Sequence, residues 1–332
     1  MDPIILEQMD QQAQQILADF VPDKVFDTHA HIYEETPDSF RSKRRANKPF
    51  ACHDLESYRQ CMARLLPGRT VQVNMFPNAA DKNFVTNRAH LLSNDAFLAE
   101  QLEKDPLNTA EIIVLPGESA ESLESRLTHP RMRGFKCYYG LVPDVKDPNL
   151  CYPEEFLPES AWEIANERGM VITLHLSRPY GLSDPANLVY IKTMAKRYPN
   201  ATLILAHAAR GYTSWTTVEA VDQIAHLDNV WYDFSAIFES PAPFQILNKV
   251  GVSRCMWGTD YSVCISRTKC IGLGLDYSWL GDRILDVFGG HNWDVGTQTL
   301  MAIRQACIMA DLTPSQVEDL FYNNAMRLFH GK

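Results

Sequence analysis

Two histidines separated by one residue stand at the end of an apolar segment, VFDTHAHI at residues 25–32, in a chain that holds only ten histidines. The β-branched and aromatic residues of this segment favour a β-strand, in which side chains alternate between two faces. Asp27, His29 and His31 then point to one side, and two imidazoles on one face lie close enough to bind one cation. A pair of hydrogen-bonded core histidines explains the segment equally well, so the rest of the chain must decide.

Four further polar residues stand late in later apolar segments. Lys136 follows MRGF, His175 follows VITL, His207 follows LILA, and Asp260 ends MWGTD. Separate core histidines would each need a buried partner, because an unpaired buried polar group costs free energy. A shared divalent cation would satisfy several of them together. Neutral imidazoles and one carboxylate suit Zn²⁺ or a similar ion that keeps a position open for water or substrate.

The elements that would carry these residues alternate along the chain. Eight strand candidates are separated by helix-like stretches, the pattern of an α/β protein with a single (β/α)8 TIM barrel. The active site of such a barrel lies at the carboxyl ends of its strands, where the polar residues stand. A doubly wound open sheet is the competing fold, but no glycine-rich phosphate loop follows the first strand. The strand candidates are 25–32, 70–76, 110–116, 132–139, 170–176, 201–207, 229–235 and 254–260, and the helical candidates include 119–128, 159–168, 186–197 and 215–226.

One domain spanning residues 1–332 is the simplest organisation, since no low-complexity linker and no break in composition divides the chain. An amphipathic helix is expected at residues 4–20, where apolar residues recur at helical spacing. A closing helix is expected at 314–329, with Thr313 as its N-cap and Gly331 after its end.

Two segments, 34–69 and 261–296, are longer than a minimal barrel needs. Both follow the carboxyl ends of strands, so we interpret them as lids or substrate walls. The first contains a basic run, for which a solvated loop is the simpler interpretation and a lid that attracts anions the sharper one. The run consists of Arg41, Lys43, Arg44, Arg45 and Lys48.

Composition and charge exclude several classes of protein. The net charge of −10 and the pI near 5.5 argue against a general binder of nucleic acid or anionic membranes. No segment approaches the roughly 20 apolar residues of a membrane span, and the N-terminus lacks the basic region of a signal peptide. Eight scattered cysteines without a CxxC motif indicate reduced thiols. We expect a cytoplasmic enzyme with a small-molecule substrate, and the sequence leaves a homo-oligomer open.

Four segments, DTHAHI, TLHLSRP, LILAHAARGY and WGTDYS, resemble the signature segments of the amidohydrolase superfamily. The nearest group is the amidohydrolase-2 type, which includes aminocarboxymuconate semialdehyde decarboxylase and related lactonases and hydratases. The resemblance extends from about residue 24 to NNAMRLF near the end of the chain. It implies a metal-dependent (β/α)8 barrel in which His29, His31, His175 and Asp260 form the metal site and His207 lies beside the reactive water or substrate.

The chemistry of these residue types agrees with that implication. A divalent metal can lower the pKa of a bound water to about 7, which makes hydroxide available at neutral pH. Asp260 can bind the metal weakly or accept the proton of that water and pass it to a leaving group. His207 can hold the water or polarise the scissile carbonyl. We therefore predict Asp260 and His207 as the catalytic residues.

Lys136 has three open interpretations. Some members of the superfamily carbamylate a lysine of the fourth strand to bridge two metals, whereas others in the amidohydrolase-2 group hold one metal. A lysine that reaches solvent from the strand end is the third possibility. We favour one divalent ion, Zn²⁺ first and Mn²⁺ as the alternative, with Lys136 binding an anionic group of the substrate.

Two arginines each lie three residues beyond a site histidine, Arg178 in HLSR and Arg210 in HAAR. A guanidinium binds a carboxylate through two hydrogen bonds, so both residues are candidates for binding an acidic substrate. An ion pair with a neighbouring loop explains each arginine equally well.

The sequence predicts a metal-dependent hydrolase that cleaves an ester, lactone or amide bond of a small carboxylated molecule. Non-oxidative decarboxylation of an acidic substrate is the alternative within the fold, with the metal and the arginines holding the acid. A catalytically inactive barrel that serves as a scaffold is the third hypothesis, and it is disfavoured because every expected metal-site position is filled.

Overall fold

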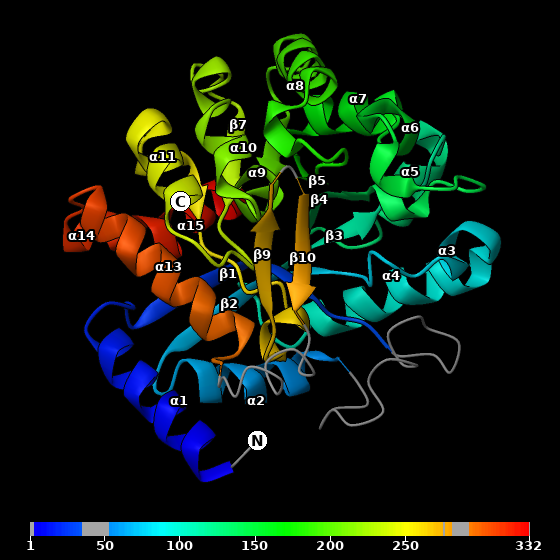
Figure 1. Ribbon diagram of the computed structural model, residues 1–332. Helices are drawn as coiled ribbons and strands as arrows, with labels where there is room; N and C mark the ends of the chain where they lie inside the picture. Colours follow the sequence, from blue (N-terminus) through cyan, green and yellow to red (C-terminus); the bar gives the residue numbers. More distant parts are fainter. Residues whose placement is uncertain (1–2, 35–52, 275, 281–291, 332) are drawn as a thin grey trace.

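The computed structural model describes residues 3–34, 53–274, 276–280 and 292–331. Eight parallel strands form one sheet in the order of the chain, from β1 to β8 (Figure 1). Six of the strands are fully buried or nearly so, as the continuous apolar runs of the sequence require of a parallel sheet covered on both sides. The strands are β1 Lys24–His31, β2 Thr70–Phe76, β3 Thr109–Ile113, β4 Met132–Tyr138, β5 Val171–His175, β6 Thr202–Leu205, β7 Val230–Asp233 and β8 Cys255–Met256.

The sheet closes between β1 and the segment that follows β8. Thr28 N–H donates to Trp257 O over 3.1 Å, and Ala30 forms a parallel bridge with Tyr261. Each strand from β1 to β8 pairs with the next, so closure yields a barrel with helices around it (Figure 1). The prediction of an α/β fold with a (β/α)8 barrel is confirmed.

The helices outside the barrel begin where the sequence supplies a capping side chain. A carboxylate, amide or hydroxyl oxygen accepts a backbone N–H at the start of α2, α4, α5, α8, α13 and α14. The helices are α1 Pro3–Ala18, α2 Leu55–Leu65, α3 Asn83–Thr86, α4 Arg88–Leu102, α5 Ala120–Arg126, α6 Pro153–Phe156, α7 Glu159–Arg168, α8 Pro185–Arg197, α9 Ala206–Arg210, α10 Ser214–Val218, α11 Pro241–Val250, α13 Val295–Met309, α14 Pro314–Glu318 and α15 Asn324–His330.

The predicted closing helix begins at Thr313, whose side chain accepts the N–H of Gln316, and ends at Gly331 with a φ of 67°. A π-helical turn at Asp319–Asn323 interrupts it between α14 and α15. The amphipathic helix expected at residues 4–20 is α1, which ends two residues earlier.

Three expectations about element bounds need correction. Strands β6 and β8 end before His207 and Asp260, so both residues stand on the turns that follow the strands. The helix expected at 215–226 is only α10 followed by a 3-10 turn at Val221–Gln223. The segment 34–69 is not wholly an insertion, because it contains α2, the helix that connects β1 to β2.

The segment that follows β8 forms an antiparallel hairpin of β9 (Lys269–Leu273) and β10 (Asp276–Leu280). It lies across the barrel in Figure 1, in front of the strands. Tyr277 of β10 packs against Tyr212, whose ring lies against His207, so this part of 261–296 does contribute a wall beside the strand ends.

The basic run at residues 41–48 lies outside the described residues. Among the helices that the structure describes, none combines the length and the apolar character that crossing a membrane requires.

Candidate metal centre

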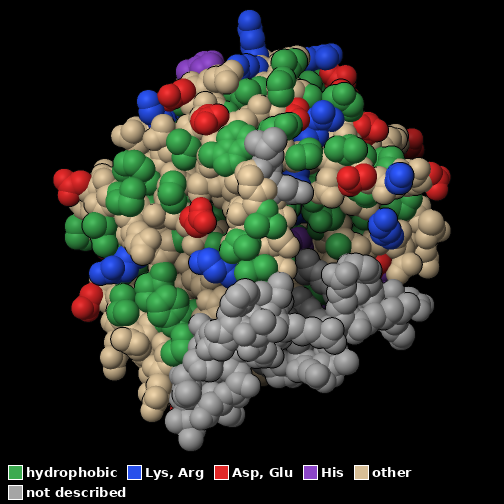
Figure 2. Space-filling view, viewed as in Figure 1, with side chains coloured by type: hydrophobic (Ala, Val, Ile, Leu, Met, Phe, Trp, Pro, Cys, Tyr) green, Lys and Arg blue, Asp and Glu red, His purple; other side chains and the backbone are tan. Residues whose placement is uncertain are grey.

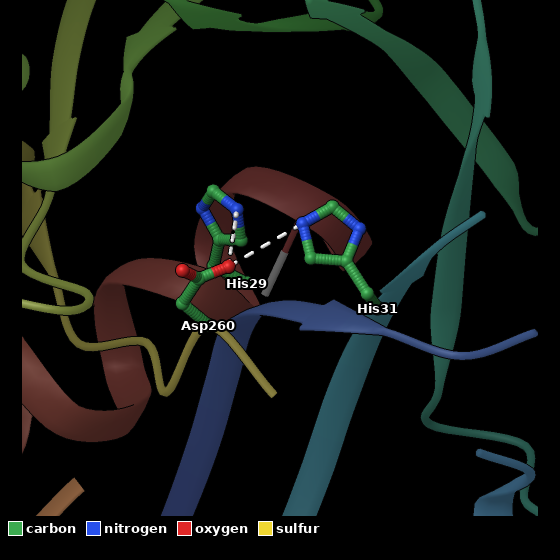
Figure 3. Close-up of side chains that lie close together, drawn as sticks. All are labelled: His29, His31 and Asp260. Carbon is green, nitrogen blue, oxygen red and sulfur yellow. Dashed lines mark ion pairs between the residues drawn. The ribbon is translucent and has the colours of Figure 1, made fainter. Parts of the chain in front are cut away.

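The two histidines of β1 and the aspartate after β8 meet at the carboxyl end of the barrel (Figure 3). Asp260 Oδ1 lies 3.4 Å from His31 Nε2 and 3.6 Å from His29 Nε2. Asp260 N–H donates to His29 O over 2.7 Å, which fixes the turn after β8 to β1. Two ligand atoms on a tetrahedral Zn²⁺ about 2.1 Å away are about 3.4 Å apart, so this spacing fits one ion.

The four candidate histidines share one arrangement of their second ring nitrogen. Each Nδ1 lies within hydrogen-bond distance of an oxygen that can only accept. For His29 this oxygen belongs to the carboxylate of Asp233, 2.9 Å away. For His31, His175 and His207 it is the backbone carbonyl of Pro77, Leu176 and Ser235, at 2.6, 3.0 and 3.0 Å. The proton of a neutral ring therefore resides on Nδ1, and Nε2 keeps its lone pair. Metal-binding histidines are held in this way by partners of their second nitrogen, so the donor set fits a divalent cation.

His207 stands on a turn with an unusual backbone. Residues 207–210 have φ values of 58°, 51°, 60° and 60°, in the left-handed region that side chains with a Cβ rarely adopt. Asp233 Oδ1 accepts the N–H of His207 over 3.1 Å and that of Ser235 over 3.0 Å. The interior carboxylate of β7 therefore stabilises this turn.

His175 lies beside His207, with ring centroids 4.9 Å apart, rather than beside His31 and Asp260. Two groups of described residues have ligand atoms within 4.8 Å of one another: His29 with His31 and Asp260, and His29 with His207 and Asp233. Neither group includes His175. The structure thus brings three of the four predicted metal ligands together and places the fourth next to the predicted catalytic histidine.

Burial and charge set the protonation of the site. Burial alone would raise the pKa of Asp260, but the interaction with His31, 3.4 Å away, and the other nearby imidazoles outweigh it, and the pKa lies well below its usual range. Burial lowers the pKa of His207 to about 4. The pKa of His175 is also far below its usual value, because of burial and of the neighbouring His207. At neutral pH the imidazoles of His175 and His207 are therefore neutral and Asp260 is ionised, the forms that bind metal.

Lys136 extends into the barrel from β4 and is only 1% exposed. Its Nζ lies 3.0 Å from His29 Nε2 and 4.8 Å from the centre of the Phe76 ring. Burial lowers the pKa of this lysine, while Asp233, Asp260 and Glu111 act in the opposite direction. The interpretation of Lys136 as a side chain that reaches solvent is therefore wrong.

Arg178 contacts the loop before α6. Its Nη1 donates to Leu150 O over 2.9 Å, its Nε lies 2.9 Å from Asp184 Oδ1 in an ion pair, and its guanidinium lies 4.5 Å from the ring of Tyr152. These are the contacts that the loop-pairing interpretation of this arginine requires.

Arg210 is only 5% exposed and is held by neutral groups. Its Nη1 donates to Arg178 O over 2.6 Å, and its Nη2 donates to Asn149 Oδ1 and to the Tyr277 hydroxyl over 3.0 and 3.2 Å. Its guanidinium lies 5.5 Å from the ring centres of both Tyr139 and Tyr277. Within the part of the chain that the structure describes, no carboxylate forms an ion pair with Arg210, and its Nε is buried without a hydrogen-bond partner.

Aromatic residues around the histidines were not anticipated from the sequence. Tyr138 and Tyr139 pack against His175 with centroids 5.1 and 5.3 Å away, and Tyr212 stacks on His207 at 5.4 Å. Alternation along β4 puts Tyr138 on the same side as Lys136, which was a usable signal for it. Tyr212 and Tyr277 are brought in by the left-handed turn and the hairpin, and no periodicity marks them.

The face of the molecule over the strand ends carries mixed charges. Figure 2 shows Lys and Arg side chains interspersed with Asp and Glu on this face, and the surface is hollowed near its centre. No large region of one charge stands out among the residues shown in colour.

Comparison with known proteins identifies the family to which the chain belongs. The sequence matches the family model described as amidohydrolase over residues 26–331. Among curated proteins, no sequence matches this chain.

Similar solved structures share the fold at low sequence identity. An amidohydrolase from Burkholderia multivorans is 15% identical with a TM-score of 0.59, covering 92% of this chain and 98% of its own, and another structure of an amidohydrolase from that organism contains bound zinc. The 4-oxalomesaconate hydratase of Rhodopseudomonas palustris is 14% identical with a TM-score of 0.58, covering 92% and 95%. The 5-carboxyvanillate decarboxylase of Sphingomonas paucimobilis is 12% identical with a TM-score of 0.55, covering 93% and 99%. Since the family model spans nearly the whole chain, the chain belongs to the amidohydrolase family and is an enzyme of that type.

Proposed function

We propose that this enzyme hydrolyses an ester, lactone or amide bond of a small carboxylated molecule with the help of one divalent cation. We further propose that it is a cytoplasmic enzyme with one barrel domain. Zn²⁺ is our first choice of metal and Mn²⁺ the second, because neutral imidazoles and a carboxylate suit both ions.

The observation that carries the proposal is the common orientation of the histidines. All four Nδ1 atoms face acceptors, so each neutral ring carries its lone pair on Nε2, at the end of the barrel where the carboxylate of Asp260 stands; His29 Nε2 also faces Lys136 Nζ, 3.0 Å away. His29, His31 and Asp260 would hold the ion, and His175 would complete the set. When bound, such an ion polarises an oxygen ligand and lowers the pKa of water.

The protein's own residues support proton transfer at this end of the barrel. Ionised Asp260 can accept a proton at a carboxylate oxygen and return it to a leaving group. Ser235 Oγ donates its single proton to Asp233, so it can only accept from His207 Nδ1, 2.9 Å away. Since Nδ1 of His207 is thus the donor, its Nε2 would accept a hydrogen bond from water. This tautomer supports a role in holding water over a role in polarising a carbonyl.

Lys136 and the two arginines are the proposed substrate-binding residues. The lone pair of His29 Nε2 cannot accept a hydrogen bond from Lys136 and bind a cation at the same time. Metal binding therefore requires the hydrogen bond between Lys136 and His29 to break. The released ammonium would then be available to an anionic group of the substrate. Arg210, buried without a carboxylate partner among the described residues, is the stronger arginine candidate, and Arg178 the weaker one because it already pairs with Asp184.

Decarboxylation of an acidic substrate is the second candidate. The buried guanidinium of Arg210 favours it, because a substrate carboxylate would supply the missing counter-ion. Similar structures include both decarboxylases and a hydratase. An inactive scaffold is no longer a candidate, since the chain is an enzyme of the amidohydrolase family.

The test combines metal analysis with a substrate panel. Purified protein should contain about one divalent ion per chain, and a chelator should abolish its activity. Metal-loaded protein is then assayed against lactones and aromatic acids, with acid release followed by pH-stat and CO₂ measured in parallel. Acid release without CO₂ supports hydrolysis, and CO₂ release supports decarboxylation. Metal-free protein whose activity resists chelation would refute the proposal.

A further inference from the structure

Asp233 connects the two parts of the site. It is fully buried at the end of β7, and its carboxylate has four partners: His29 Nδ1 on Oδ2, and on Oδ1 the N–H of His207, the N–H of Ser235 and the hydroxyl of Ser235. These partners come from β1, from the turn after β6 and from the segment after β7. One carboxylate therefore holds elements that are far apart in the sequence.

Asp233 determines which nitrogen of His29 carries the proton, and its contact with Ser235 agrees with the proton position in His207. A carboxylate only accepts hydrogen bonds, so the proton of His29 must lie on Nδ1, 2.9 Å from Asp233 Oδ2. The hydroxyl proton of Ser235 is directed to Asp233, so Ser235 Oγ accepts from His207 Nδ1. The carboxylate thus acts directly on His29, whereas His207 Nδ1 also faces the Ser235 carbonyl, 3.0 Å away, which by itself requires a proton there. In both rings Nε2 is left as the basic nitrogen.

We propose that Asp233 is a positioning residue that fixes the tautomer of His29, so that its Nε2 is the nitrogen available to a cation. This inference rests on the metal site of the proposed function. The proposed role of Asp233 differs from a merely structural one. An asparagine at this position would preserve the packing, because it has the same shape, but it would reverse the tautomer of His29.

The decisive substitution is Asp233→Asn. The amide oxygen can replace Oδ1 and keep its bonds to His207 N–H and to Ser235, while the amide NH₂ replaces Oδ2. An NH₂ donor opposite His29 Nδ1 favours the tautomer in which that nitrogen accepts and Nε2 carries the proton, with Lys136 Nζ, 3.0 Å away, accepting it as a neutral amine. Nε2 would then have to lose this proton before it could bind a metal ion. Loss of an outer-shell partner of a metal-binding histidine typically lowers metal affinity by about 10- to 100-fold.

The experiment reads the tautomers and the metal affinity separately. Nitrogen-15 NMR of histidine-labelled, chelator-treated full-length protein distinguishes protonated from unprotonated ring nitrogens. The parent should show His29 and His207 with the proton on Nδ1, and Asp233→Asn should move it to Nε2 in His29 alone. Titration with Zn²⁺ should give a dissociation constant at least tenfold higher for this variant.

Ser235→Ala is the matched control. It removes one partner of the same carboxylate without touching His29, so the His29 tautomer should persist and the Zn²⁺ dissociation constant should stay within about twofold of the parent. Unchanged tautomers in Asp233→Asn, or a parent protein whose His29 carries its proton on Nε2, would overturn the inference. The parent spectrum decides even if the variant does not fold. A parent with the expected tautomers that binds no Zn²⁺ would instead refute the proposed function alone.

Discussion

Glu111 is a carboxyl group buried inside the barrel, and its replacement should change how stability depends on pH. Asn74 Nδ2 and Thr173 Oγ1 donate to Glu111 Oε1 over 2.7 and 2.9 Å, and Thr173 N–H donates to Oε2 over 3.3 Å. Burial nevertheless dominates and raises the pKa to about 7 from a usual value of 4.5, against these hydrogen bonds and the charge of Lys136. The folded protein thus holds this proton more tightly than the unfolded chain does.

The size and sign of the effect follow from that difference. A group that binds its proton more tightly in the folded state contributes stability that is lost as pH rises from the unfolded pKa towards the folded pKa. For Glu111 this window extends from about 4.5 to about 7. A difference of about 2.5 pKa units corresponds to about 3 kcal/mol of unfolding free energy. Glu111→Gln has no titrating group at this position, so it should lack this contribution.

Urea unfolding of the parent and of Glu111→Gln at pH 4.5 and pH 7.5, at matched metal content, measures the effect. At pH 4.5 the variant should be the less stable protein, because its amide NH₂ would face the N–H of Thr173. Between the two pH values the stability of the variant relative to the parent should rise by about 3 kcal/mol. Titrating groups that do not interact with Glu111 cancel in this comparison, and Lys136, which does interact with it, is tested by repeating the comparison in a Lys136→Met background. A difference that stays constant with pH would show that Glu111 titrates alike in the folded and unfolded states, and the reasoning from burial would be wrong.

Three further predictions concern the site itself. Asp260→Asn should leave the fold and most of the metal in place while kcat falls by about 100-fold or more, and near-normal turnover in a folded variant would remove Asp260 from proton transfer. Lys136→Met should bind Zn²⁺ at least as tightly as the parent, because no ammonium must leave His29, and its KM for an acidic substrate should be higher. A metal content that falls from two ions per chain to one would instead indicate a carbamylated lysine that bridges two metals. Arg210→Lys keeps the charge but loses the planar fork, so KM for the acid should rise with metal content unchanged, whereas Arg178→Lys should have the smaller effect.

Much of the fold could be predicted because its signals are local. Alternation in β1 places His29 and His31 together, and a threonine followed by proline marks the start of the closing helix. The order of eight strands predicts a barrel, since parallel strands joined by helices have few other ways to bury both faces. These inferences need only the periodicity of a strand and the chemistry of a helix cap.

The details of the site depend on contacts that no local pattern specifies. Asp27 shares the parity of His29 and His31, yet its carboxylate accepts hydrogen bonds from Tyr58 and Thr259, and the register of β1 shifts between residues 27 and 30. His175 ends β5 as predicted, but it lies against His207 instead of entering either close group of ligand atoms. Such positions are set by the packing of neighbouring strands and loops.

The turn at residues 207–210 shows why the sequence could not give the full site. Its residues are histidine, two alanines and arginine, with no glycine to favour a positive φ. Left-handed conformation costs each such residue about 1–2 kcal/mol, so propensity alone predicts a different backbone here. Asp233 and Ser235 offset this cost from another strand by accepting the N–H and the ring proton of His207. The same turn directs Arg210 inward between Tyr139 and Tyr277, where a guanidinium without a carboxylate would otherwise be unfavourable. This backbone conformation places His207, the proposed water-holding residue, and the buried Arg210 at one end of the barrel. Conformational cost concentrated at such a position is typical of functional sites, which agrees with the proposal that the site binds an anionic substrate.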